Sequence, residues 1–148
     1  MNQVNTIRIL IADDDPDDRL LLKEAFEESR LSNIMDFTVD GQDLIDYLRR
    51  QGPYAGLKNL PLPGLILLDL NMPRKDGREA LAEIKSDPDL RRIPVIVFTT
   101  SENEDDVLRS YDLGVNSFLV KPVTFEGLVY SVRTMTDYWL QIVRLPTT

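Results

Sequence analysis

The sequence predicts one α/β domain in which five βα units form a doubly wound parallel sheet. A chain of 148 residues corresponds to about one domain, and 43% of its residues are hydrophobic, so it can bury a core. Short apolar runs alternate along it with longer segments whose apolar residues recur at helical spacing. Continuous apolar strands that alternate with helices are typical of a parallel sheet covered on both faces. Because crossovers between such strands are right-handed, we expect a doubly wound sheet.

Five apolar runs are predicted as β-strands, in chain order 7–12, 34–39, 65–68, 94–98 and 117–120. Helices are predicted between and after them, at about 16–30, 44–48, 77–86, 103–113 and 125–143. Pro16 suits a first helical turn, and Gly114 is typical of a residue that ends a helix. The proline- and glycine-rich segment 51–64 is the one long loop. The same alternation continues on both sides of it, so we interpret it as an insertion within one domain.

Composition narrows the possible functions. The formal charge is −8, from 17 Lys and Arg against 25 Asp and Glu, which disfavours nucleic acid or an anionic membrane as the main partner. The chain has no Cys and no His, which excludes disulfides, zinc-thiolate sites, imidazole ligands and Ser-His-Asp triads. No apolar stretch is long enough to span a membrane, and the polar N-terminus lacks a signal-peptide pattern. We therefore expect a cytoplasmic protein.

Charged and polar side chains follow four of the five predicted strands. Asp13 and Asp14 follow the first strand, Asp69 the third, Thr99 the fourth and Lys121 the fifth. In open parallel sheets, sites lie beyond the carboxyl ends of the strands, near the point where the winding changes direction. We therefore expect three carboxylates, one hydroxyl and one ammonium group to meet at one edge of the sheet.

These side chains suit a phosphoryl group held beside a metal. Three close carboxylates repel one another, and their pKa values rise unless a cation is present. Because the available ligands are oxygen atoms only, the expected cation is Mg²⁺ or a similar hard ion. Lys121 can offset the charge of a phosphoryl group, and Thr99 can donate a hydrogen bond to it. The candidate nucleophile is a carboxylate, since acyl phosphates are established covalent intermediates.

Taken alone, the acidic residues have a simpler explanation. Asp13, Asp14 and Asp15 could form only a polar strand end before a helix N-terminus, where acidic residues are favoured. Asp17 and Asp18 are interpreted in that way, as residues that favour the helix N-terminus rather than bind metal. The combination with Asp69, Thr99 and Lys121 at other strand ends favours a functional site.

Four motifs carry a resemblance to a known family. The segments ILIADDDPDD, LILLDLNMPRKDG, VIVFTTSE and SFLVKP, in this order and spacing, resemble the receiver domain of two-component response regulators. The resemblance covers about residues 6–136. It implies a flavodoxin-like sheet with strand order 2-1-3-4-5 and a single receiver domain over 1–148. The core of that domain would span about 6–136, and an extended C-terminal helix would lead into an extension of about 137–148.

The resemblance also implies roles for the acidic residues. Asp69 would be the phosphoacceptor for a phosphoryl group from a partner histidine kinase. Asp14 would bind Mg²⁺ directly, Asp13 would bind it through water, and Asn71 would contribute its backbone carbonyl. The chain would then be a signalling protein that catalyses only its own phosphorylation and dephosphorylation, and not an enzyme.

Further roles are implied for the residues that follow the last two strands. Thr99 would reposition to hydrogen-bond the phosphoryl group, and Lys121 would pair with it; the bond between Lys121 and Pro122 is cis in the family. Phe118 takes the place of the aromatic residue that follows Thr99 inward, without the hydroxyl of a Tyr. Thr100 stands where the family often has a smaller residue, so we expect it to restrict the water that hydrolyses the aspartyl phosphate.

The last predicted helix is longer than its packing requires. Its first half has enough apolar residues to pack against the sheet: Phe125, Leu128, Val129, Val132 and Met135. Further apolar residues follow, among them Tyr138, Trp139, Leu140 and Val143. They could fold back on the same domain. Because large exposed aromatic patches are rarely left free, we expect them to form an oligomer or partner surface, with a homodimer as the simplest case.

No DNA-binding or catalytic segment follows this helix, so we expect output through protein contacts or onward phosphoryl transfer. The insertion, KSDPDLRRIPV, SYDLG and the terminal DYWL and LP together resemble the stand-alone regulators paired with bacterial phytochrome kinases. That resemblance implies a red-light sensor kinase as phosphodonor.

Three other functions are supported less well by these residues. Phosphatases of the haloacid dehalogenase type also form an aspartyl phosphate, but typically carry a second acid two residues after it, where this chain has Asn71. A receiver-like scaffold without phosphorylation is disfavoured by the complete acidic set. A P-loop enzyme is disfavoured because the phosphate-binding motif does not occur.

Overall fold

The computed structural model describes residues 7–29, 33–142 and 145–146. Five parallel strands form one sheet in the order β2-β1-β3-β4-β5. The strands are β1 (Ile9–Ala12), β2 (Met35–Thr38), β3 (Leu65–Leu68), β4 (Val95–Thr99) and β5 (Ser117–Val120). The predicted doubly wound parallel sheet and its strand order are confirmed.

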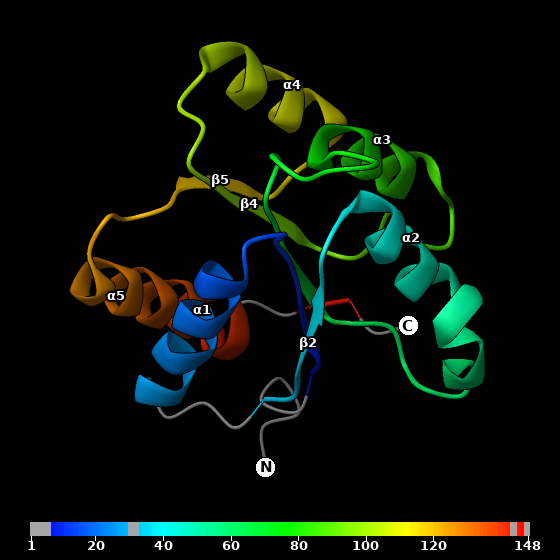
Figure 1. The fold of residues 1–148 in the computed structure, drawn as a ribbon, viewed down its shortest axis with the longest axis horizontal. Helices are drawn as coiled ribbons and strands as arrows, with labels where there is room; N and C mark the ends of the chain where they lie inside the picture. The colour runs from blue at the N-terminus through cyan, green and yellow to red at the C-terminus, as the bar shows by residue number, and fades with distance from the viewer. Residues whose placement is uncertain (1–6, 30–32, 143–144, 147–148) are drawn as a thin grey trace.

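Five α-helices cover the two faces of the sheet (Figure 1). They are α1 (Pro16–Glu28) and α5 (Phe125–Thr136) on one face, and α2 (Gly41–Arg49), α3 (Gly77–Ser86) and α4 (Glu104–Leu113) on the other. Each starts after a side chain that accepts a hydrogen bond from a first-turn N–H: Asp15, Asp40, Asp76, Asn103 and Thr124. Asp15 therefore serves the start of α1. Within the described ranges, no helix is both long and apolar enough to cross a membrane.

The core has two halves, one on each face of the sheet. Alternate strand residues face α2 and α3, namely Leu10, Ala12, Ile66, Leu68 and Val95. The residues between them face α1 and α5, namely Ile9, Ile11, Leu65, Leu67 and Ile96. Burial on both faces explains why these strands are continuous apolar runs. It also leaves the strand ends as the place where polar side chains gather.

The insertion, expected to be a loop, contains a 3₁₀ helix, η2 (Gly52–Leu57). Tyr54 holds it against α2, because its hydroxyl donates to Asp43 Oδ1 at 2.7 Å. Arg50, in the left-handed conformation at the end of α2, donates to the Pro61 carbonyl oxygen at 3.0 Å. Side-chain contacts thus order a segment whose glycine and proline content predicts only turns.

The last helix changes character along its length. The sequence predicts a continuous helix over 125–143, whereas α5 ends at Thr136 and a π-helix, η3 (Asp137–Ile142), continues it. At the junction the Thr136 hydroxyl donates to the Val132 carbonyl oxygen at 2.8 Å, a side-chain contact of the kind that bends helices. Trp139 packs against the core half under α1 and α5. The extension therefore folds in part back onto its own domain.

Candidate functional site

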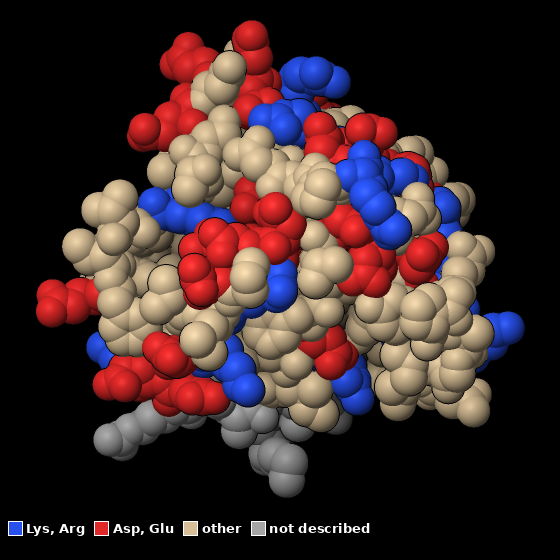
Figure 2. Space-filling model, viewed as in Figure 1, with Lys and Arg blue, Asp and Glu red and all other residues tan. Residues whose placement is uncertain are grey.

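The ends of β1 and β3 bring the three predicted carboxylates together. The backbone N–H of Asp69 donates to the Ala12 carbonyl oxygen at 3.0 Å, so the residues that follow β1 and β3 lie side by side. Asp13, Asp14 and Asp69 each place one carboxylate oxygen within 4.8 Å of the other two. Figure 2 shows the acidic side chains that gather over the end of β1 and the start of α1. These three carboxylates therefore lie together at one edge of the sheet, as expected.

Most of this site is closed to water. Thr99 is 0% exposed, Asp13 1% and Asp69 6%, whereas Asp14 is exposed. Burial raises the pKa of Asp13, and hydrogen bonding, chiefly from Lys121, lowers it by less. Buried carboxylates held in this way are stabilised by added positive charge. Because all the available donors are oxygen atoms, the group fits a hard divalent cation.

Lys121 is the cation in this group. Its Nζ lies 2.6 Å from Asp13 Oδ2, 2.9 Å from Asp18 Oδ2 and 2.9 Å from Asp69 Oδ2. Burial lowers the pKa of Lys121, and hydrogen bonds to the three carboxylates raise it by more, so the ammonium group stays charged. The sequence interpretation of Asp18 missed its contact with Lys121. Pro16 predicts where α1 starts, but the direction of the Asp18 side chain depends on tertiary packing, so the sequence carried no local signal for this contact.

Asp69 is held at both of its carboxylate oxygens. Oδ1 accepts hydrogen bonds from the Thr99 hydroxyl at 2.8 Å and from the backbone N–H of Asn71 at 3.1 Å. Oδ2 pairs with Lys121. The Asn71 side chain is exposed, and its contact with Asp69 is made by its backbone N–H. These contacts fix the orientation of the carboxylate.

The loop between β3 and α3 passes close to Asp69. The Gly77 N–H donates to the Leu70 carbonyl oxygen at 2.9 Å, and a Cβ atom at Gly77 would lie 2.2 Å from the Asp69 carbonyl oxygen. A residue with a side chain would therefore displace the loop. At the far side of the loop, the Gly41 N–H donates to the Lys75 carbonyl oxygen at 2.7 Å, which ties the loop to the start of α2.

The expected cis peptide bond after β5 is not found. The family resemblance implies a cis bond between Lys121 and Pro122, whereas the described chain contains no cis peptide bond. Before a proline, the trans form is favoured by only about 0.5–1 kcal/mol, so the residue types themselves leave both forms accessible. In the trans form Lys121 reaches all three carboxylates.

Two further predicted residues lie on or next to the last two strands, Phe118 within β5 and Thr100 directly after β4. Phe118 is half-buried and packs against the core half under α2 and α3, and its backbone N–H donates to the Tyr111 hydroxyl at 3.3 Å. Thr100 is exposed beside the buried Thr99. Phe118 thus lies on the strand that contacts α4, so a movement of β5 or α4 would change its surroundings.

The expected interface residues are only partly described. Tyr138 is 53% exposed and meets the half-buried Trp139 edge to face, with ring centroids 5.4 Å apart. The side chain of Leu140 and the whole of Val143 lie outside the described residues. Of the two described side chains, Tyr138 therefore presents a large aromatic surface to solvent.

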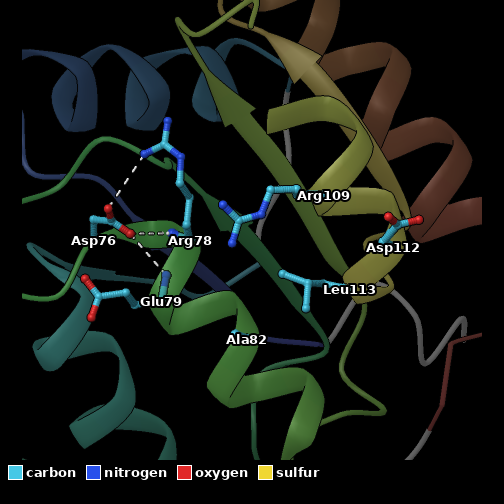
Figure 3. Close-up of a pocket in the computed structure, with 7 residues that line it drawn as sticks. All are labelled: Asp76, Arg78, Glu79, Ala82, Arg109, Asp112 and Leu113. Atoms are coloured by element: carbon cyan, nitrogen blue, oxygen red, sulfur yellow. Dashed lines mark hydrogen bonds and ion pairs between the residues drawn. The ribbon is translucent and has the colours of Figure 1, made fainter. Parts of the chain in front are cut away.

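A groove between α3 and α4 contains none of the predicted site residues (Figure 3). It is lined by Asp76, Arg78, Glu79, Ala82, Arg109, Asp112 and Leu113. Arg78 also forms a two-point ion pair with Asp106 of α4, with both N···O distances at 2.6 Å. Hydrogen bonding to Arg78 lowers the pKa of Asp106 to about 2. Sequence reasoning did not find this pair, because two residues 28 positions apart on different helices carry no local signal.

Residues 9–133 match the protein family described as the response regulator receiver domain. The chain belongs to this family and is therefore a receiver-domain response regulator, a signalling protein. Response regulator Rcp1 of Synechocystis sp. is 46% identical over 138 residues, which are 93% of this chain and 92% of Rcp1.

Two solved structures of similar proteins share the fold. One is the phosphorylated cyanobacterial phytochrome response regulator RcpA, with a TM-score of 0.89 and 44% identity, covering 96% of this chain and 99% of that one. The other is the Mn²⁺-bound form of Rcp1, with a TM-score of 0.87 and 45% identity, covering 95% and 99%. This chain is therefore similar over nearly its full length to response regulators that have been solved with a phosphoryl group or a divalent metal.

Proposed function

We propose that this chain is a stand-alone response regulator that accepts a phosphoryl group on Asp69 from a histidine kinase. The arrangement around Asp69 carries the proposal. Its buried carboxylate pairs with Lys121 at 2.9 Å and accepts a hydrogen bond from Thr99 at 2.8 Å, next to Asp13 and Asp14. Similarity to phosphorylated RcpA supports the same conclusion.

Mg²⁺ is the proposed cation. Asp13, Asp14 and Asp69 would hold it together with the backbone carbonyl of Asn71, since oxygen ligands suit a hard ion. When bound, the ion neutralises charge on the phosphoryl oxygens. The Mn²⁺-bound form of Rcp1 supports a divalent ion in a protein of this kind.

The side chains of the site position the reacting groups. A carboxylate oxygen of Asp69 bonds to phosphorus while the bond from phosphorus to the donor breaks, and the donor leaves with that electron pair. Lys121 offsets the charge of the transferred group. The barrier to phosphoryl transfer is lowered mainly by holding the attacking and leaving groups in line, and less by acid-base chemistry. In the later hydrolysis, water attacks phosphorus. Inorganic phosphate is released, and Asp69 becomes a carboxylate again.

Thr99 is the proposed link between the phosphoryl group and the protein surface. Its hydroxyl, which donates to Asp69 Oδ1, would donate instead to a phosphoryl oxygen. This movement at the end of β4 would change the packing of Phe118 and the surface formed by α4, β5 and α5. Because Phe118 has no hydroxyl, it acts in this switch through packing alone.

The proposed phosphodonor is a phytochrome-type histidine kinase in the cytoplasm. Similarity to the phytochrome response regulator RcpA and to Rcp1 supports this pairing. The acidic balance, with a formal charge of −8, supports a protein partner in preference to nucleic acid or an anionic membrane. We place the receiver core at about 6–136 and the extension at about 137–148.

The extension is the proposed homodimer surface, with Tyr138, Trp139, Leu140 and Val143 as its apolar residues. The 53% exposure of Tyr138 supports this role. Light scattering at high micromolar concentration should show a dimer, measured with and without an acyl-phosphate mimic. A monomer under both conditions would contradict the proposal.

Intact mass spectrometry tests the phosphorylation directly. After incubation with Mg²⁺ and a small acyl phosphate, the wild type should gain the mass of one phosphoryl group. Asp69→Asn should gain none. Asp89→Asn, which changes an exposed aspartate outside the site, should behave as wild type. Wild-type protein that gains no mass would contradict the proposed function and favour an unphosphorylated scaffold.

A further inference from the structure

One of the three carboxylates that contact Lys121 lies outside the proposed metal site. Lys121 Nζ lies 2.6 Å from Asp13 and 2.9 Å from both Asp18 and Asp69. An ammonium group has three N–H donors, so these three contacts occupy it fully. Asp13 and Asp69 belong to the group of carboxylates that fits a cation, whereas Asp18 does not.

Asp18 is positioned by helix α1. It is the third residue of that helix, which Pro16 begins and which Asp15 caps by accepting from the Asp17 N–H at 2.9 Å. Its side chain is 34% exposed, against 2% for Asp13 and 8% for Asp69. Asp18 is therefore the most exposed anchor of Lys121 and the one whose position does not depend on a strand end.

We infer that Asp18 is a positioning residue for Lys121, which keeps one ammonium N–H occupied when Asp13 and Asp69 take other partners. The inference rests on the proposed function, in which Asp69 becomes bonded to phosphorus and Asp13 faces the metal. In that state Lys121 loses two of its three anchors and binds a phosphoryl oxygen. A flexible lysine already held at one point loses less conformational freedom when it binds the transferred group.

Asp18→Asn tests this role, because it keeps the side-chain shape and an acceptor oxygen but removes the charge that strengthens the contact. Phosphorylation by a small acyl phosphate with Mg²⁺, followed over time by intact mass, should be about three- to tenfold slower than in wild type. Asp17→Asn is the matched control. It removes one charge from an exposed side chain of the same helical turn, and Asp17 makes no ion pair with Lys121 in the described structure. It should react at the wild-type rate.

A double-mutant cycle separates positioning from a general effect of charge. In a Lys121→Met background, Asp18→Asn should cause no further slowing, because the residue it positions is gone. The inference is wrong if Asp18→Asn slows the reaction by the same factor with and without Lys121. It is also wrong if Asp18→Asn matches Asp17→Asn.

A second readout does not depend on phosphorylation. The ¹⁵Nζ NMR signal of Lys121, identified by its absence in Lys121→Met, reports whether the ammonium protons are held or exchange freely with water. After Mg²⁺ is added, Asp13 and Asp69 both take the metal as a partner, so wild type and Asp17→Asn should keep this signal through Asp18, and Asp18→Asn should lose it. A signal retained in Asp18→Asn would overturn the inference.

The same measurements distinguish this inference from the proposed function. If wild type gains no phosphoryl mass, the proposed function fails and the positioning role fails with it. If wild type is phosphorylated and Asp18→Asn matches its control, only the role of Asp18 fails.

Discussion

The Thr99 hydroxyl donates to Asp69 Oδ1 at 2.8 Å, and both residues are buried. The group proposed to sense a phosphoryl group is thus already bound to the proposed acceptor. Phosphorylation would exchange one hydrogen-bond acceptor for another at Thr99, so the energy difference between the two states is smaller than a newly formed bond would give. This exchange makes the Thr99 contact the first one to test.

Thr99→Val should destabilise the protein. It keeps the shape of the side chain and leaves Asp69 Oδ1 without its 2.8 Å donor. Hydrogen bonds to charged groups contribute about 1.5–3 kcal/mol, so the free energy of unfolding in urea should fall by about that amount. Thr100→Val, at the exposed neighbouring position, is the control and should change it little. Equal losses in the two variants would show that the buried bond contributes nothing.

The ion pair between Arg78 and Asp106 should make stability depend on pH. The pKa of Asp106 is lowered from 3.8 to about 2, so its contribution is present above pH 3.8 and is lost as the pH falls toward 2. Asp106→Asn should lower the free energy of unfolding at pH 7 by about 1 kcal/mol, since the arginine is partly exposed to solvent. The difference from wild type should shrink as the pH falls. Asp105→Asn, at the exposed neighbour, should show no such pH dependence.

Gly77→Ala should strongly destabilise the protein, because the added Cβ would lie 2.2 Å from the Asp69 carbonyl oxygen and 2.6 Å from the Leu70 Cα. The β3–α3 loop would have to move, and we expect a loss of about 2 kcal/mol or more. Gly56→Ala is the control, since nothing lies within 4 Å of its Cβ position. Urea unfolding of both variants measures the difference. A stable Gly77→Ala protein would mean that the loop moves at little cost.

Thr100→Ala should shorten the lifetime of the phosphorylated state. Thr100 is exposed beside Thr99, where its side chain can restrict the approach of water. We expect loss of the phosphoryl group to become about two- to tenfold faster, because the attacking water is less restricted. The decay of the phosphorylated mass over time measures this rate. An unchanged rate would assign the restriction to another residue.

The parts of the structure that sequence could predict depend on local patterns. Apolar runs and the residues that stop them give all five strands, and Asp69 and Thr99 lie at or directly after strand ends, as expected. The topology then brings the acidic residues together, because parallel strands end at the same edge. The sequence alone therefore predicts that Asp13, Asp14 and Asp69 lie close together.

The parts that sequence could not predict depend on side-chain direction. The contact between Asp18 and Lys121 joins residues 103 positions apart, and whether an acid in a first helical turn faces a lysine is set by tertiary packing. The 3₁₀ helix η2 is likewise ordered by Tyr54 and Arg50, which contact other segments. The π-helix η3 begins where the Thr136 hydroxyl bonds back to the preceding turn, a local detail that helical periodicity does not contain.

Trp139 is the only tryptophan in the chain, and it lies on η3 against the core half under α1 and α5. Its fluorescence emission therefore reports on one contact, that of the C-terminal segment with the core. Circular dichroism follows the sheet and helices as a whole. If the two signals change at different urea concentrations, the gap between them measures how independently this segment detaches from the rest of the fold.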